Sequence, residues 1–245
     1  MVDKPRRRKQ NKFPWKKVVA VVVVVLLAGV VGWYVYSNYV YRAPPVYVRV
    51  STSLGSFDVE LFPACAPKTV ANFVSLVNSG FYSDLAWHRI VKGFVIQTGD
   101  PNSRGAQDQT RPNWGSGGSN NTIPLEVGIC SWIGNYQGYL GMARTGNATS
   151  GLDTATSQFY INLSNSTSNL QLNSLNYATF GKVIDNFSVV QAIGNSVTLQ
   201  SLCVGITNPP SECSNSWPTT EPYPAVLVNS IVMLPGLPAS VSTTT

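Results

Sequence analysis

The chain has 245 residues, with 17 Lys or Arg, 11 Asp or Glu and a formal net charge of +6. Eight of the basic residues lie between Lys4 and Lys17, where only Asp3 opposes them, so the remainder has a net charge of −1. That remainder offers no basic face to a phosphate backbone, which argues against nucleic-acid binding. Its length suits one well-packed domain rather than two.

An uncharged apolar segment, Val18 to Tyr36, follows a basic tail at residues 1–17. As a helix it would be about 28 Å long, close to the hydrocarbon thickness of a bilayer. A buried strand and a cleaved signal peptide are the alternatives, but Trp33, Tyr34 and Tyr36 are typical of an interfacial aromatic belt rather than a cleavage site. We therefore expect an uncleaved single-pass anchor in the cell membrane, with a cytoplasmic N-terminus and an extracytoplasmic C-terminal domain.

The remaining sequence divides into a linker at residues 37–45, a domain at residues 46–235 and a Ser/Thr-rich tail at residues 236–245. Its Ser-, Thr- and Asn-rich composition suits an extracytoplasmic surface. Asn-x-Ser/Thr sequons can arise by chance in such loops, so glycosylation stays open. The sequons are at Asn120, Asn147, Asn162, Asn165 and Asn186.

All four cysteines follow the apolar segment, and an exported compartment permits disulfides. Of the three possible pairings, we favour the one in which Cys203 and Cys213 close a short ring, which leaves Cys65 with Cys130. The cysteines are scattered and His88 is the only histidine, so we expect no metal and no cofactor.

Hydrophobic periodicity predicts a mainly β domain. It begins with a hairpin over Val46–Leu61, and a helix follows between Pro67 and Gly80. A second helix begins near Asn186. Antiparallel strands with two helices indicate a closed barrel capped by those helices. The other strands are expected at Trp87–Gln97, Tyr139–Ala143, Gln158–Leu163, Ala178–Val183 and Ala225–Leu234.

Five sequence blocks carry a family resemblance. In order they are FDVELFPACAPKTVANFVSLVNSGFY from Phe57, WHRIVKGFVIQTGD from Trp87, GYLGMAR from Gly138, SQFYINLS from Ser157 and YATFGKVID from Tyr177. Together they resemble the cyclophilin-type peptidyl-prolyl cis-trans isomerases, as a membrane-anchored, prokaryote-like member. The resemblance implies a cyclophilin-like barrel that catalyses rotation about Xaa-Pro bonds of exported or membrane proteins and so assists their folding. We expect a monomer whose partners are proline-containing segments.

The resemblance also implies a site. Arg89 matches the family's arginine, which donates a hydrogen bond to the prolyl nitrogen as its lone pair localises. Phe94 and Gln97 complete the catalytic set. From the residues alone, Arg89 could instead form a surface ion pair, and a buried structural role is expected for His88. The implied substrate-binding residues are Val95, Met142, Ala143, Arg144, Gln158, Tyr160, Leu172 and Tyr177.

Three of these positions depart from the family pattern. Val95 stands where methionine is usual, Tyr160 where phenylalanine is usual, and Leu172 lies in a stretch without the tryptophan of animal cyclophilins. We expect a smaller, more polar pocket with weak sensitivity to cyclosporin. The insert Asn102–Trp132 receives no site residues.

Three rival interpretations stay open. The first is a catalytically weak binding or chaperone module for proline-containing segments. The second is an exported hydrolase, although no Gly-x-Ser-x-Gly motif occurs. The third is a structural surface protein whose polar loops solvate it.

Overall fold

The computed structural model divides into two compact units, Met1–Arg42 and Ala43–Thr245. The structure describes residues 15–35, 43–146, 149–204, 213 and 220–241. The predicted basic tail up to residue 14, most of the linker, the sequon at Asn147 and the last four residues lie outside these ranges. The predicted domain limits stay predictions.

The described part of the first unit is a helix, α1 (Trp15–Val35), whose residues are all exposed. It begins three residues before the predicted span and includes Lys16 and Lys17. Its mean hydropathy reaches 2.8, and it is long and apolar enough to cross a membrane, a test that a signal sequence also passes.

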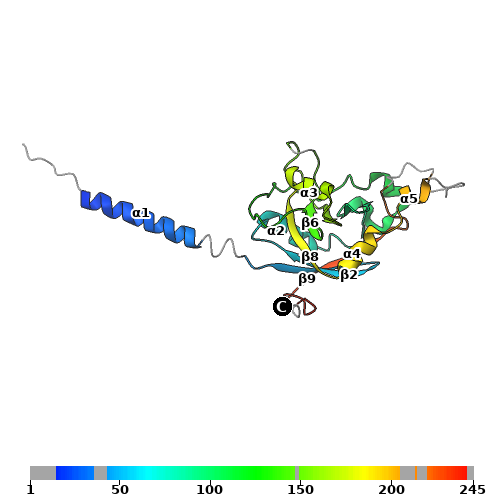
Figure 1. Ribbon diagram of the computed structural model, residues 1–245, viewed down its shortest axis with the longest axis horizontal. Coiled ribbons are helices and arrows are strands. Elements are labelled where there is room, and N and C mark those ends of the chain that lie inside the picture. The colour runs from blue at the N-terminus through cyan, green and yellow to red at the C-terminus, as the bar shows by residue number, and fades with distance from the viewer. Residues whose placement is uncertain (1–14, 36–42, 147–148, 205–212, 214–219, 242–245) are drawn as a thin grey trace, which may run out of the picture. The chain divides into compact units, whose positions relative to one another are not determined.

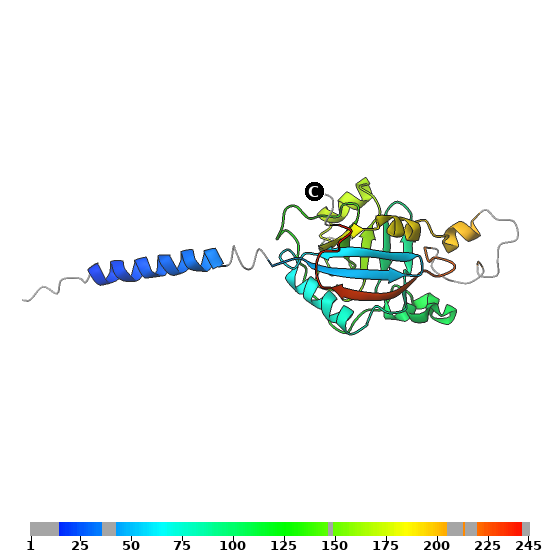
Figure 2. The same cartoon turned by 90° about the horizontal axis from the view of Figure 1, so that it is seen from below.

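The second unit is built on one antiparallel sheet of nine strands in the order β3-β9-β1-β2-β8-β6-β7-β5-β4. Figure 2 shows β9 beside β1, although the two strands come from opposite ends of the unit. The strands are β1 (Val46–Thr52), β2 (Gly55–Leu61), β3 (Leu85–Ala86), β4 (Arg89–Val91), β5 (Val95–Thr98), β6 (Tyr139–Met142), β7 (Phe159–Asn162), β8 (Thr179–Asp185) and β9 (Leu227–Leu234).

The sheet curls into a barrel because its two edge strands are neighbours in the chain. Only Trp87 and His88 separate β3 from β4, so the edges lie close together. The interior is packed with aromatic rings. Phe73 contacts Tyr82, Phe159 and Phe180, with ring centroids 5.2 to 5.4 Å apart. The predicted class, a mainly β antiparallel barrel with helices, is confirmed.

Helices cover parts of this barrel (Figure 1). In α2 (Pro67–Asn78), proline occupies the first turn and Val70, Phe73 and Val77 face the core, as the periodicity predicts. The helix α4 (Phe187–Gly194) buries Val190 and Ile193. The structure adds α3 (Thr167–Ser174), α5 (Leu199–Cys203) and the 3-10 helices η2 (Pro101–Ala106) and η3 (Asp108–Asn113).

One predicted strand is wrong. The segment Trp87–Gln97 is not continuous but folds into the β4–β5 hairpin, in which Arg89 pairs with Gln97. Gly93 has a φ of +73° in the turn, a conformation that glycine adopts without steric cost. The hairpin over Val46–Leu61, by contrast, is confirmed over its full register.

Both predicted disulfides are present, Cys65–Cys130 and Cys203–Cys213. Among the described sequons, Asn162 is completely buried and hydrogen-bonded, so it is not open to a glycan. Asn120, Asn165 and Asn186 are exposed.

Candidate functional site

The β4–β5 hairpin presents the predicted catalytic residues. Arg89 and Gln97 are paired directly across the two strands, so their side chains lie on the same face. Phe94 ends the intervening turn, and the guanidinium carbon of Arg89 lies 5.9 Å from its ring centroid. A cation and an aromatic side chain are thus placed together by the shortest hairpin of the sheet.

These residues form the rim of a cavity of about 230 Å³, called here the arginine cavity. Its floor is a small apolar cluster of Val95, Tyr160 and Leu172, each less than 9% exposed. This cluster is separate from the main core. The complete lining is Arg89, Phe94, Val95, Gln97, Ala143, Arg144, Tyr160, Leu172 and Tyr177.

Arg89 is half-buried at this rim, and burial lowers the pKa of its guanidinium. An arginine nonetheless stays protonated in a protein, so it acts as a fixed hydrogen-bond donor. Its Nη1 donates a long hydrogen bond of 3.4 Å to Oε1 of Gln97. A guanidinium has five N–H donors, which leaves several for a ligand in the cavity.

Gln97 is held in turn by Gln158 on the segment before β7. Nε2 of Gln97 donates to Oε1 of Gln158 at 2.8 Å. Nε2 of Gln158 then donates to the carbonyls of Gly115 and Gly117 at 2.9 and 2.6 Å. This chain fixes the amide orientation of both glutamines, so Gln97 turns its oxygen toward Arg89.

A second cavity of about 260 Å³ adjoins the first and shares Gln97, Ala143 and Arg144 with it. The loop residues Gly115 to Ser119 form one wall, and we call this space the glycine cavity. At Gly118 a Cβ atom would overlap the hydroxyl of Thr156, so the close approach of the wall requires glycine there.

Arg144 lines both cavities. Its guanidinium stacks over Tyr177 at 4.5 Å and donates to the carbonyls of Leu175 and Asn176. These contacts tie the segment after α3 to the end of β6. Arg144 therefore shapes part of the wall of both cavities.

Buried asparagines support the floor of the arginine cavity. The hydroxyl of Tyr160 donates to Oδ1 of Asn135 at 2.6 Å, and Asn135 donates to Asn173 and to the carbonyl of Tyr177. A Cβ atom at Gly141 would overlap the Tyr160 ring, so glycine is required there too. Asn169 donates to the carbonyl of Phe94 and holds α3 over the hairpin.

The structure brings nine of the eleven predicted residues together around the arginine cavity. Gln158 lines the adjoining glycine cavity. Met142 lies elsewhere: it is 3% exposed, belongs to the main core and lines a separate small space beside Ala155. In the structure its side chain packs in the barrel interior, and its predicted contact with substrate stays a prediction.

His88 is buried, as predicted, and burial lowers its pKa to about 4. Among the described residues, neither ring nitrogen has a hydrogen-bond partner of acceptable geometry, although Gln158 and the Ala86 carbonyl approach the ring.

Sequence reasoning missed the residues that build the walls. The insert Asn102–Trp132 supplies the carbonyls of Gly115 and Gly117, and Asn135 follows it. The Gly-Ser-Gly-Gly-Ser run at residues 115–119 was the available signal, since such a run marks a close backbone approach. Nothing in the sequence pattern marks Asn135 as buried.

The fold and the site define an antiparallel barrel with an apolar slot, a guanidinium at its rim and a polar groove beside it. The sequence model of the cyclophilin type peptidyl-prolyl cis-trans isomerase/CLD family matches residues 47–212. The chain belongs to this family. It is a peptidyl-prolyl cis-trans isomerase, an enzyme that turns Xaa-Pro bonds without breaking them.

The chain is also similar to individual members of this family. A peptidyl-prolyl cis-trans isomerase of Acinetobacter baylyi is 34% identical over 62% of this chain and 73% of its own length. Peptidyl-prolyl cis-trans isomerase A of Dickeya dadantii is 33% identical over 75% of this chain and 86% of its own. A crystal structure of a cyclophilin type isomerase from Cryptosporidium parvum is similar with a TM-score of 0.61, at 27% identity, over 79% of this chain and 100% of that one. The same isomerase has also been crystallised in the presence of the dipeptide Ala-Pro.

Proposed function

We propose that the enzyme binds a Xaa-Pro segment with the proline ring in the arginine cavity, and that Arg89 is the catalytic group. The observation that carries this proposal is the placement of a protonated guanidinium at the rim of an apolar cluster. The proline ring suits the apolar floor of Val95, Tyr160 and Leu172, while the neighbouring peptide backbone meets the polar residues Gln97 and Arg144.

Rotation about a Xaa-Pro bond is slow because of amide resonance. The barrier to rotation is about 18–20 kcal/mol because the prolyl nitrogen shares its lone pair with the carbonyl. In the twisted state that lone pair is localised and can accept a hydrogen bond. A donor from Arg89 then binds the twisted state more strongly than either planar state, which lowers the barrier.

We further propose that the enzyme works outside the cytoplasm, anchored by α1, on exported or membrane proteins. The helix is long and apolar enough to span, and Trp33 and Tyr34 lie at its C-terminal end, as in an interfacial aromatic belt. Two disulfides are typical of an oxidising compartment. Exported proteins fold there with Xaa-Pro isomerisation as a slow step, so a tethered isomerase would act where they appear.

Protease protection tests the location. The full chain would be inserted into sealed membrane vesicles of known orientation and digested from one side. We expect a protected fragment containing residues 43–245 when the extracytoplasmic face is enclosed, and its loss when that face is outward. Release of an unanchored domain from washed vesicles would contradict the anchor and favour a cleaved signal.

A further inference from the structure

An aromatic surface lies at the end of the domain where the chain enters from α1. Phe62 follows β2, and its ring lies 5.1 Å from Trp132 and 6.2 Å from Tyr139. Tyr136 packs edge-to-face on Tyr139 at 5.6 Å. We call these four residues the aromatic patch. It belongs to neither cavity of the site.

Two of the four rings in the patch are exposed, while Phe62 is buried beneath them at 7%. Among the described residues of the unit Ala43–Thr245, Trp132 and Tyr136 are the two large aromatic side chains on the exposed surface, at 58% and 41%. Both lie on one loop, which the Cys65–Cys130 disulfide ties to the segment before α2. Val127 on the same loop is 42% exposed. An exposed aromatic cluster on a fixed loop usually marks an interaction surface.

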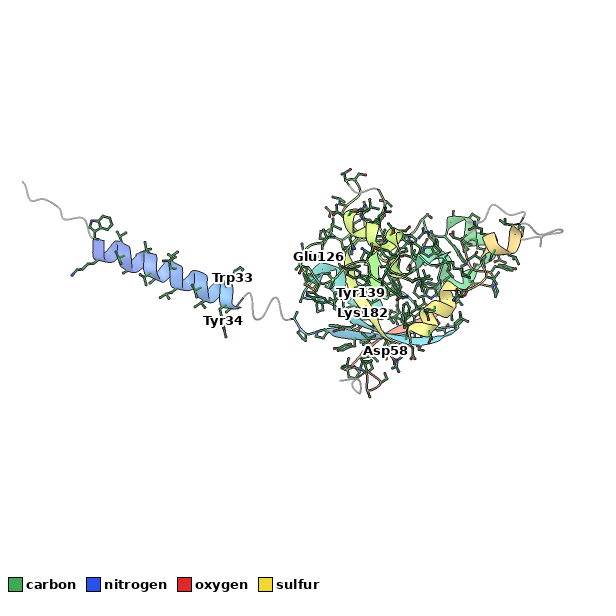
Figure 3. The ribbon with its side chains drawn as sticks, in the orientation of Figure 1. Trp33, Tyr34, Asp58, Glu126, Tyr139 and Lys182 are labelled. Atoms are coloured by element: carbon green, nitrogen blue, oxygen red, sulfur yellow. A yellow bond between two sulfur atoms is a disulfide. The ribbon has the colours of Figure 1, made fainter. Side chains whose placement is uncertain are left out.

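The sheet places the patch beside the entry of the chain. In the antiparallel register, Val46 at the start of β1 pairs with Leu61, the residue before Phe62. At this end of the sheet, a row of outward-facing side chains also crosses four strands. In this row Tyr47 pairs with Glu60, Glu60 with Lys182, and Lys182 with Tyr139. Figure 3 shows Tyr139 and Lys182 on the side of the domain at which β1 begins.

Charge in this row is balanced. The Lys182 ammonium lies 5.6 Å from the Tyr139 ring centroid, as a cation–π contact, and it also lowers the pKa of Glu60, which burial raises. Glu126, on the same loop as Trp132, is occupied by the backbone N–H groups of Lys68 and Thr69. The surface is therefore aromatic and near neutral, which matches a lipid headgroup layer better than a strongly charged partner.

We propose that the aromatic patch docks on the lipid headgroup layer of the membrane that α1 spans. This inference rests on the anchoring proposed above. Ten residues separate the end of α1 at Val35 from β1 at Val46, and a chain of that length reaches at most about 35 Å. Such a short tether gives an effective concentration on the order of millimolar, so even weak interfacial binding is well populated. Trp132 and Tyr136 bury their rings at the acyl boundary and keep their polar atoms in the headgroup layer.

Lipid quenching tests the docking. The full chain would be reconstituted in phosphatidylcholine vesicles whose acyl chains are brominated close to the headgroup. The emission of Trp132 is isolated as the difference between the wild type and Trp132→Phe, a change that keeps an aromatic ring against Phe62. We expect bromination to remove most of this difference emission.

A relocated tryptophan provides the matched control. Val197 is 51% exposed and lies two residues before α5. The helix α5 is on the far side of the domain from the start of β1 (Figures 1 and 2). In Trp132→Phe/Val197→Trp, the added emission should be unaffected by bromination. Equal quenching at both positions, or none at Trp132 in a chain that floats with the vesicles, would overturn the docking and leave the anchor standing. A chain that does not float would refute the anchor and the docking together.

Discussion

Tyr160 shows how one hydroxyl distinguishes this site from the usual family pattern. Its ring forms the apolar floor, and its hydroxyl donates to Asn135 beneath the cavity. Burial raises the pKa of Tyr160, so the phenol stays protonated and remains a donor at any physiological pH. The substitution thus makes the support of the pocket more polar without putting a charge in it.

Tyr160→Phe should therefore destabilise the fold and spare catalysis. Loss of a buried hydrogen bond costs about 1–2 kcal/mol of unfolding free energy, reduced here because Asn162 also donates to Oδ1 of Asn135. Urea unfolding of the chain in detergent micelles, with kcat/KM alongside, checks this. A large loss of kcat/KM at unchanged stability would instead give the hydroxyl a role in turnover.

Gln97 is the second residue whose geometry makes a definite prediction. Its side-chain oxygen accepts a hydrogen bond from Arg89, and its side-chain nitrogen donates one to Gln158. Gln97 therefore orients the guanidinium, which remains the catalytic donor. Gln97→Ala should lower kcat/KM about tenfold, the equivalent of one ordinary hydrogen bond in the transition state. The matched control is Gln137→Ala, since Gln137 lies outside both cavities and bonds the Leu163 carbonyl. Equal losses in the two variants would show a general effect on the fold rather than on the site.

Much of the site could be predicted from the sequence because several of its residues are close together along the chain. Arg89, Phe94 and Gln97 lie in one short motif that folds on itself, so their proximity needs no knowledge of distant contacts. Met142, the last residue of β6, packs in the core, whereas the two residues that follow it, Ala143 and Arg144, line the arginine cavity.

At the scale of elements, α3 is the clearest miss. Its sequence TSNLQLNS has no apolar periodicity, and its buried residues are Asn169 and Leu172. The helix is specified by Ser166, whose hydroxyl accepts from the backbone of Asn169, and by the contact of Asn169 with Phe94. Tertiary hydrogen bonds of this kind leave no pattern that a sequence window can detect, whereas α2 and the first hairpin were predictable from periodicity.

The two disulfides should contribute unequally to stability. Cys65–Cys130 closes a loop of 65 residues and Cys203–Cys213 one of 10. Loop-closure entropy then predicts losses of about 4 and about 3 kcal/mol when each is removed. The double variants Cys65→Ala/Cys130→Ala and Cys203→Ala/Cys213→Ala would be compared by urea unfolding. A larger loss from the shorter loop would contradict the entropic account.

At the scale of the whole molecule, a buried ion pair joins the segment before β9 to the insert that forms the glycine cavity. Glu221 is completely buried and accepts from Nη1 of Arg111 at 3.2 Å. Arg111 also pairs with Asp108 and stacks over Trp114, the residue before Gly115. Distant parts of the chain thereby fix the loop that holds Gln158.

This pair makes stability depend on pH. Burial raises the pKa of Glu221 to about 7, and Arg111 opposes the shift. Because the folded carboxyl holds its proton more tightly than the unfolded one, its contribution to the unfolding free energy is complete below pH 4.5 and is lost as pH rises to about 7. The total change is at most about 3 kcal/mol.

Glu221→Gln isolates this contribution, because it removes the titration and keeps the shape. The wild type should lose stability relative to the variant as pH rises from 4.5 to about 7, and no further above that. Taking the difference also removes the opposite contribution of His88, whose lowered pKa makes stability rise with pH from about 4. Urea unfolding across this range provides the measurement, and a pH-independent difference would show that Glu221 remains charged throughout.

The catalytic role of Arg89 is tested most directly by the rate of Xaa-Pro rotation. This rate would be measured by exchange NMR for the wild type, Arg89→Ala and Lys92→Ala in the same detergent. Lys92 is an exposed cation in the β4–β5 turn, so its removal controls for charge. We expect catalysis by the wild type and Lys92→Ala, and a loss of about 10² to 10³ in kcat/KM for Arg89→Ala. A folded Arg89→Ala variant that retains wild-type activity would contradict the catalytic role. A wild type that shifts the peptide resonances without accelerating exchange would make the protein a binding module instead.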